Sequence, residues 1–130
     1  MIAIDTNILV RLLANDDPAQ SPRAARLFAD EDVFVPRTVL LETEWVLRFS
    51  YELSRSTIHA ALERVLAVAS VVVEGPAEVG LALDWYRAGM AFADALHVAS
   101  SAGAARFMTF DAKLRRAARR SNVNPPVELA

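Results

Sequence analysis

Cysteine is absent from the 130 residues. Disulfide bonds, thiolate metal sites and a cysteine nucleophile are therefore excluded, and we expect a reducing compartment, the cytoplasm. Long apolar runs are also missing, as is a basic-then-apolar segment at the start, so we expect neither a membrane span nor a signal peptide. The net charge of −2 gives no overall attraction to nucleic acid, which leaves only local charge for such contacts.

The composition is that of a folded globular chain. Hydrophobic residues make up 54% and charged residues 23% of the sequence, which separates it from disordered proteins. The length fits one ordinary domain with one core. No repeat, linker or low-complexity segment interrupts it, so we expect a single domain over residues 1–130.

Short apolar runs alternate with helical patterns along the chain. Strands are expected at residues 1–4, 33–35, 71–73, 107–110 and 127–129. Helices are expected at residues 8–13, 19–28, 38–51, 54–69, 75–86, 92–102 and 111–120. A turn is expected at residues 15–18, between the first two. This alternation predicts a three-layer α/β/α fold with a mainly parallel central sheet.

Two aspartates directly follow predicted strands. Asp5 comes after the first strand and Asp111 after the fourth, and ligands of open α/β sheets bind beyond the carboxyl ends of the strands. Each aspartate is also well placed to cap the helix that follows it, because Asp is a preferred N-cap residue. The capping role is at least as well supported for either residue alone, and the two roles are compatible.

Glu42 lies within a predicted helix and shares a helical stripe with three apolar residues, Val39, Val46 and Phe49. We therefore expect its carboxylate on the core-facing side. Glu44 is expected on the other side, where Arg48, four residues on, offers an ordinary surface ion pair. A position at the rim, with the Glu42 carboxylate reaching water, fits the pattern nearly as well.

Asp94 lies near the start of an alanine-rich helix. It is interpreted either as an N-cap or first-turn acid that complements the helix dipole, or as a functional group. Position 97 is His rather than Glu or Gln, so no capping box supports the first interpretation. His97 is one turn away, but a lone histidine is more often structural than a metal ligand.

The four acids have a joint interpretation. Carboxylates that converge at strand ends repel one another and raise each other's pKa unless a cation joins them. Oxygen-only ligands favour a hard divalent ion, Mg²⁺ or Mn²⁺, over zinc.

These motifs, in this order and spacing, resemble the PIN-domain nucleases over nearly the whole chain, and most closely the VapC-type toxins of bacterial toxin–antitoxin pairs. The residues that carry the resemblance are Asp5-Thr6-Asn7 after an apolar strand, Glu42 in a mid-chain helix, Ala93-Asp94-Ala95-Leu96-His97, and Thr109-Phe110-Asp111.

The resemblance implies a PIN-like fold and a role for each matching position. Asp5, Glu42, Asp94 and Asp111 match the catalytic acids that hold Mg²⁺ or Mn²⁺. The residues that match supporting positions, which orient carboxylates or water, are Thr6, Asn7 and Thr109. No further acid follows Asp94 or Asp111 closely enough to act as a fifth ligand, which leaves one-metal and two-metal chemistry both open.

The implied activity is hydrolysis of RNA phosphodiester bonds, without a covalent protein intermediate. The implied partners are the RNA substrate, a cognate antitoxin lying in an apolar groove, and a second copy of the chain in a homodimer. Several aromatic residues are expected in the core or at such an interface: Trp45, Phe49, Tyr51, Trp85 and Tyr86.

A basic segment follows Asp111 and forms a strip at helical spacing, made of Arg115, Arg116, Arg119 and Arg120. Contact with RNA phosphates and a solvated helix end that complements the dipole are equally good interpretations of this strip.

Two other classes of protein fit the sequence less well. A receiver-type signalling domain would need two adjacent acids after the first strand and a lysine after a late strand, whereas Thr6 follows Asp5 and the single lysine, Lys113, lies inside the last helix. A PIN-like domain that has lost catalysis and only binds RNA or protein is disfavoured by the presence of all four acids.

Overall fold

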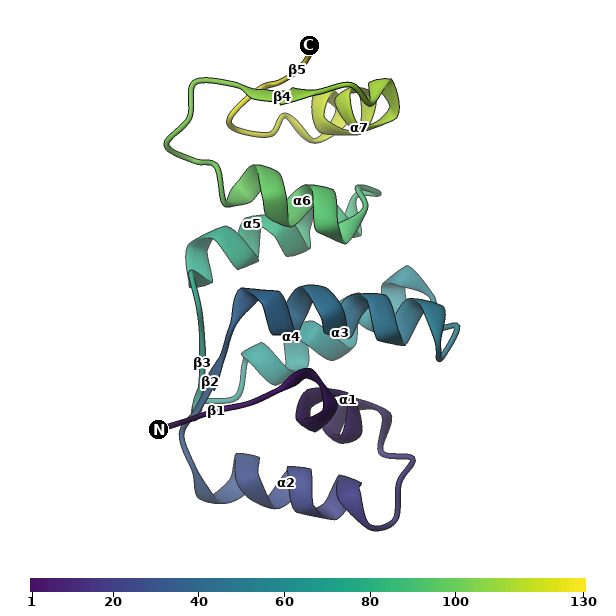
Figure 1. Cartoon of the computed structure of the whole chain (residues 1–130), viewed down its shortest axis with the longest axis vertical. Helices are drawn as coiled ribbons and strands as arrows, with labels where there is room; N and C mark the ends of the chain where they lie inside the picture. Colours follow the sequence, from purple (N-terminus) through teal and green to yellow (C-terminus); the bar gives the residue numbers. More distant parts are fainter. The chain divides into compact units, whose positions relative to one another are not determined.

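The computed structural model describes all residues, 1–130, and alternates strands with helices along the chain (Figure 1). Its internal contacts divide it into two compact units, Met1–Pro76 and Ala77–Ala130. The strands pair in two sheets, one in each unit, and every pairing is parallel. The expected α/β class with parallel strands is confirmed.

The first unit contains a three-stranded sheet in the order β1-β2-β3. Ile2 lies opposite Val33, and Val33 lies opposite Val71. Helix α1 packs on α2 and α3, and α4 packs on α3 and β3. The elements are β1 (Ile2–Ala3), α1 (Thr6–Ala14), α2 (Gln20–Asp30), β2 (Val33–Val35), α3 (Arg37–Phe49), α4 (Arg55–Leu66) and β3 (Val71–Val73).

The second unit contains a two-stranded sheet, in which Phe107 lies opposite Val127. Helix α7 packs on both of its strands, beside them in the yellow-green part of Figure 1. The elements are α5 (Pro76–Arg87), which begins at the last residue of the first unit, α6 (Phe92–Ala99), β4 (Phe107–Thr109), α7 (Ala112–Ser121) and β5 (Val127–Leu129).

Side-chain caps decide where several helices begin. Asp5, Ser54 and Asp111 each accept a hydrogen bond from a backbone N–H of the first turn that follows, because those amides have no carbonyl partner within the helix. Asn15 and Asn122 end α1 and α7 in the left-handed region, with φ of 49° and 50°, a conformation that asparagine tolerates better than most residues.

Apolar side chains fill the interior of each unit. Val33 and Val35 of β2 and Leu40 of α3 are fully buried, as expected for a parallel strand covered on both faces. In the second unit Tyr86 and Phe92 pack edge to face, with ring centroids 5.3 Å apart. None of the helices has the length and apolar character needed to cross a membrane.

Candidate active site

Asp5 is an exposed residue at the N-cap of α1, two residues beyond β1. Its Oδ1 atom accepts a hydrogen bond from the Thr6 N–H at 2.7 Å. Its Oδ2 atom makes no hydrogen bond, so one oxygen orients the carboxylate and the other is available to a ligand. Thr6 is buried and Asn7 is exposed.

Glu42 is exposed on α3, and Glu44 is the buried acid of this helix, with 2% of its surface accessible. The prediction that Glu42 lies on the core-facing stripe is therefore wrong. The buried face of α3 runs through five positions, of which Val39 alone belongs to the expected stripe; the others are Leu40, Thr43, Glu44 and Leu47.

The Glu44–Arg48 ion pair is present, with Arg48 Nε 2.9 Å from Glu44 Oε2, but its acid is buried rather than on the surface. An ionised carboxylate is buried only beside such a partner, because the free-energy cost of removing the charge from water otherwise exceeds what packing contributes. Glu42 makes no hydrogen bond or ion pair within its unit, so its carboxylate reaches water as the alternative interpretation expected.

Asp94 lies in the first turn of α6 and is half-buried. The N-cap residue of α6 is Ala91, which provides no side-chain hydrogen bond, so Asp94 is a first-turn acid and not the cap. Its carboxylate accepts no hydrogen bond within its unit.

Asp111 is exposed at the N-cap of α7. Its Oδ1 atom accepts hydrogen bonds from the backbone N–H groups of Lys113 at 2.8 Å and Leu114 at 3.3 Å. The Asp111 N–H in turn donates to Thr109 Oγ1 at 3.0 Å. Thr109 thus fixes the backbone from which the Asp111 carboxylate projects, and Oδ2 remains unbonded.

Asp111 acts electrostatically on Asp94. Burial raises the pKa of the Asp94 carboxyl, and the negative charge of Asp111 raises it further, against a smaller lowering effect of His97. Asp94 of α6 and the N-cap residue of α7, 17 positions apart in sequence, thus lie within electrostatic reach in the second unit. Asp5 and Glu42 belong to the first unit, and the structure contains no group of three or more His, Asp and Glu side chains arranged to hold a metal.

The sequence model of the PIN domain family matches residues 2–120. The chain belongs to the PIN domain family. PIN domains are generally nucleases, and those nucleases typically use divalent metals. The matched range begins in the first compact unit, ends within the second and spans the positions of all four acids. A comparison with curated proteins finds no match.

The basic strip of this PIN domain lies on α7. Arg116, Arg119 and Arg120 are exposed, whereas Arg115 is half-buried and its Nε atom is buried without a hydrogen bond. The buried face of the helix is formed by Leu114 and Ala118. The exposed arginines are therefore free to contact phosphates, and Arg115 lies at the edge of the strip.

The aromatic residues divide into a buried and an exposed set. Trp85 and Tyr86 are buried in the second unit, as the core interpretation expected. Trp45 and Phe49 are 50% and 67% exposed on α3 and stack on each other, with ring centroids 5.1 Å apart and planes 8° from parallel. Such a pair leaves apolar surface available to a partner.

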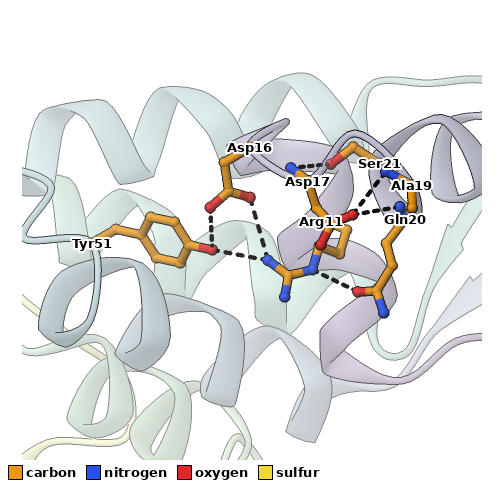
Figure 2. Close-up of polar contacts among 7 residues, drawn as sticks. All are labelled: Arg11, Asp16, Asp17, Ala19, Gln20, Ser21 and Tyr51. Atoms are coloured by element: carbon orange, nitrogen blue, oxygen red, sulfur yellow. Dashed lines mark hydrogen bonds and ion pairs between the residues drawn. The ribbon is translucent and has the colours of Figure 1, made fainter.

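A polar network around Arg11 was not predicted. Arg11 Nε donates to Gln20 Oε1 at 2.8 Å, and Nη1 lies 3.3 Å from Asp16 Oδ1 and 3.4 Å from Tyr51 Oη (Figure 2). Tyr51 Oη donates to Asp16 Oδ2 at 2.9 Å. The network links α1, the turn after it, the first residue of α2 and Tyr51, two residues beyond the end of α3.

The sequence offered only a local signal for this network. Residues 15–18 indicated a turn, and Asp17 does organise it: its Oδ1 atom accepts from the N–H groups of Ala19 at 2.9 Å and Gln20 at 2.7 Å. The partner of Asp16 and Arg11, however, is Tyr51, which is 35 and 40 residues away in sequence. A pairing over that separation has no local pattern.

Proposed function

We propose that this PIN domain is a Mg²⁺- or Mn²⁺-dependent endoribonuclease, with Asp5, Glu42, Asp94 and Asp111 as its catalytic and metal-binding acids in one domain over residues 1–130. The observation that carries the proposal is the Asp94–Asp111 pair, in which a half-buried carboxylate lies within the field of a second one. Folding places like charges together at a net cost, and such an arrangement is typical of functional sites.

The chemistry of these side chains fits a hard divalent cation. All four acids offer only oxygen donors, and neither Glu42 nor Asp94 is neutralised by a basic partner in its own unit. Asp5 and Asp111 each use one oxygen for helix capping and keep Oδ2 unbonded. When bound, Mg²⁺ or Mn²⁺ would neutralise charge on the phosphoryl group and make water more acidic.

The protein's own contribution is orientation and proton transfer. The caps of α1 and α7 fix the rotamers of Asp5 and Asp111, and Thr109 fixes the backbone of Asp111. Water attacks the phosphorus in line, a carboxylate of the set accepts its proton, and the bond to the leaving oxygen breaks. No nucleophilic side chain is required.

We further propose that the protein is the toxin of a type II toxin–antitoxin pair of the VapC type and acts in the cytoplasm. The sequence motifs support this assignment, which implies a cognate antitoxin and a homodimer as partners. The exposed Trp45–Phe49 pair on α3 provides apolar surface for such an interface, and the exposed arginines of α7 provide positive charge for the RNA substrate.

The decisive test is RNA cleavage by purified protein. Mixed cellular RNA is incubated with Mg²⁺, with Mn²⁺ or with chelator, using the wild type, Asp94→Asn and the matched control Asp84→Asn. Asp84 is an exposed acid of α5 in the same unit as Asp94. We expect cation-dependent endonucleolytic products from the wild type and the control, and none from Asp94→Asn.

Equal cutting by the wild type and Asp94→Asn would mean that the activity is a contaminant and would overturn the assignment. Binding of RNA without cutting under every cation would instead support the inactive PIN-like domain.

A further inference from the structure

A groove of about 490 Å³ lies between α1 and α2 in the first unit. Its wall includes three arginines: Arg11 of α1, and Arg23 and Arg26 of α2. Its apolar part includes Ile8 and Leu27, and Asn7 also lines it. No element of the proposed catalytic chemistry uses these arginines, so the charge of the groove needs a separate explanation.

Arg11 is held in one orientation. Its Nε and Nη1 atoms are occupied by Gln20, Asp16 and Tyr51, and its Nη2 atom makes no hydrogen bond within the chain (Figure 2). A guanidinium fixed in this way loses little conformational entropy when its remaining donors bind a ligand. The donors that remain suit an anionic oxygen.

Arg23 and Arg26 are exposed and lack a carboxylate within ion-pair distance. Both are therefore available cations, unlike Arg48 or Arg106, which pair with Glu44 and Glu128. The acids that line the groove are Asp30 and Glu31, where α2 ends.

Charge changes sign along the α2 wall of the groove. Arg11 of α1 contacts Gln20, the first residue of α2. Arg23 and Arg26 precede Asp30, the last residue of α2, and Glu31. Arg11 lies six residues from Asp5, which is about 9 Å along a helix axis.

We infer that the α1–α2 groove binds the backbone of the RNA substrate, with Arg11, Arg23 and Arg26 contacting its phosphates. The inference deepens the proposed function and depends on RNA being the substrate. Phosphates match the bidentate donors of arginine, and contacts to them position RNA without reading its sequence.

The test measures binding separately from cleavage. A fluorescent single-stranded oligoribonucleotide is titrated with protein in chelator, in an Asp94→Asn background, and its anisotropy is followed at several salt concentrations. The variant is Arg23→Gln/Arg26→Gln. The matched control is Arg64→Gln, which removes an exposed arginine from α4 in the same unit, outside the groove.

We expect the double variant to bind about tenfold more weakly and the slope of log affinity against log salt to fall by about 1.4, for two lost contacts to a single strand. The control should bind as the parent does. Tyr51→Phe, which removes one anchor of Arg11, should weaken binding less, with unchanged secondary structure.

Parent-like affinity and salt slope for the double variant would overturn the inference, as would an equal loss for Arg64→Gln. A loss confined to binding of a labelled poly-glutamate peptide, with RNA binding intact, would assign the groove to an acidic protein partner. Failure of the ribonuclease proposal is distinguishable, because it would abolish cation-dependent cutting without changing these binding curves.

Discussion

Burial raises the pKa of Asp94 on α6, and the charge of Asp111 at the start of α7 raises it further. The two residues come from separate helices of one compact unit. Their interaction is unfavourable for the folded protein alone, and a divalent cation bound as proposed above would offset it. Removal of these charges should therefore increase stability in cation-free buffer and lower the rate of RNA cleavage.

Asp94→Asn should lower RNA cleavage by about 100-fold or more and increase stability at neutral pH in cation-free buffer. Since the pKa of Asp94 is raised, the folded state binds its proton more tightly than the unfolded chain does. Stability is therefore lost as pH rises from about 3.9 through the folded-state pKa. In urea unfolding, Asp94→Asn should have a larger free energy of unfolding than the wild type at pH 7, but not near pH 3.5. An advantage of equal size at both values would contradict the electrostatic origin.

Mn²⁺ should stabilise the wild type against unfolding. A ligand that binds only the folded state adds about 2.7 kcal/mol at a hundredfold excess over its dissociation constant. The melting temperature, measured by calorimetry, should rise with Mn²⁺ concentration in the wild type and in Asp84→Asn, and much less in Asp111→Asn. An identical rise in Asp111→Asn would remove Asp111 from the metal-binding residues.

Glu42 and Glu44 lie two residues apart on α3, so a substitution at one is a control for the same substitution at the other. Glu42→Gln should change the free energy of unfolding by less than about 0.5 kcal/mol, because the side chain is exposed, and should abolish cleavage. Glu44→Gln should cost about 1–3 kcal/mol, because a buried carboxylate loses its charge-assisted bond to Arg48, and should retain cleavage. Chemical denaturation and the RNA assay together check both. If Glu44→Gln lost cleavage and Glu42→Gln kept it, Glu44 would be the catalytic acid and Glu42 would not.

Asp17→Ala should lower the melting temperature at neutral pH but not in acid. The hydrogen bonds from the Gln20 and Ala19 amides lower the pKa of Asp17, so its charged form stabilises the folded state. That contribution is present above a pH of about 3.9 and is lost as pH falls through the lowered pKa. Melting curves from pH 7 to pH 2 should converge for the wild type and the variant. Asp32→Ala, at an exposed acid with no side-chain hydrogen bond, should show no such convergence.

Much of the fold was predictable because its signals are local. Strands β2 and β3 lie where valine-rich apolar runs predict them, to the residue, and β5 also has the expected bounds. The N-caps Asp5 and Asp111 were predicted as well, since an aspartate before a helical pattern satisfies that helix's own free amides. The α/β class follows from the order of these elements.

The four acids of the candidate site stay a prediction, drawn from their positions and order in the sequence. The range that the PIN family model matches spans all four positions. The expected buried stripe of α3 was partly wrong, because Val39 is buried whereas Val46 is half-buried and Phe49 is exposed. Which stripe is buried depends on the helices that pack against it.

The sequence of this PIN domain thus carries its elements, its caps and the identity of its acids, because each depends on residues within a turn or two along the chain. Long-range packing decides the burial of Glu44, the electrostatic effect of Asp111 on Asp94 and the hydrogen bond from Arg11 to Tyr51. Those features join residues that are distant in sequence. A periodic pattern of residues does not specify which distant partner each residue meets in the folded chain.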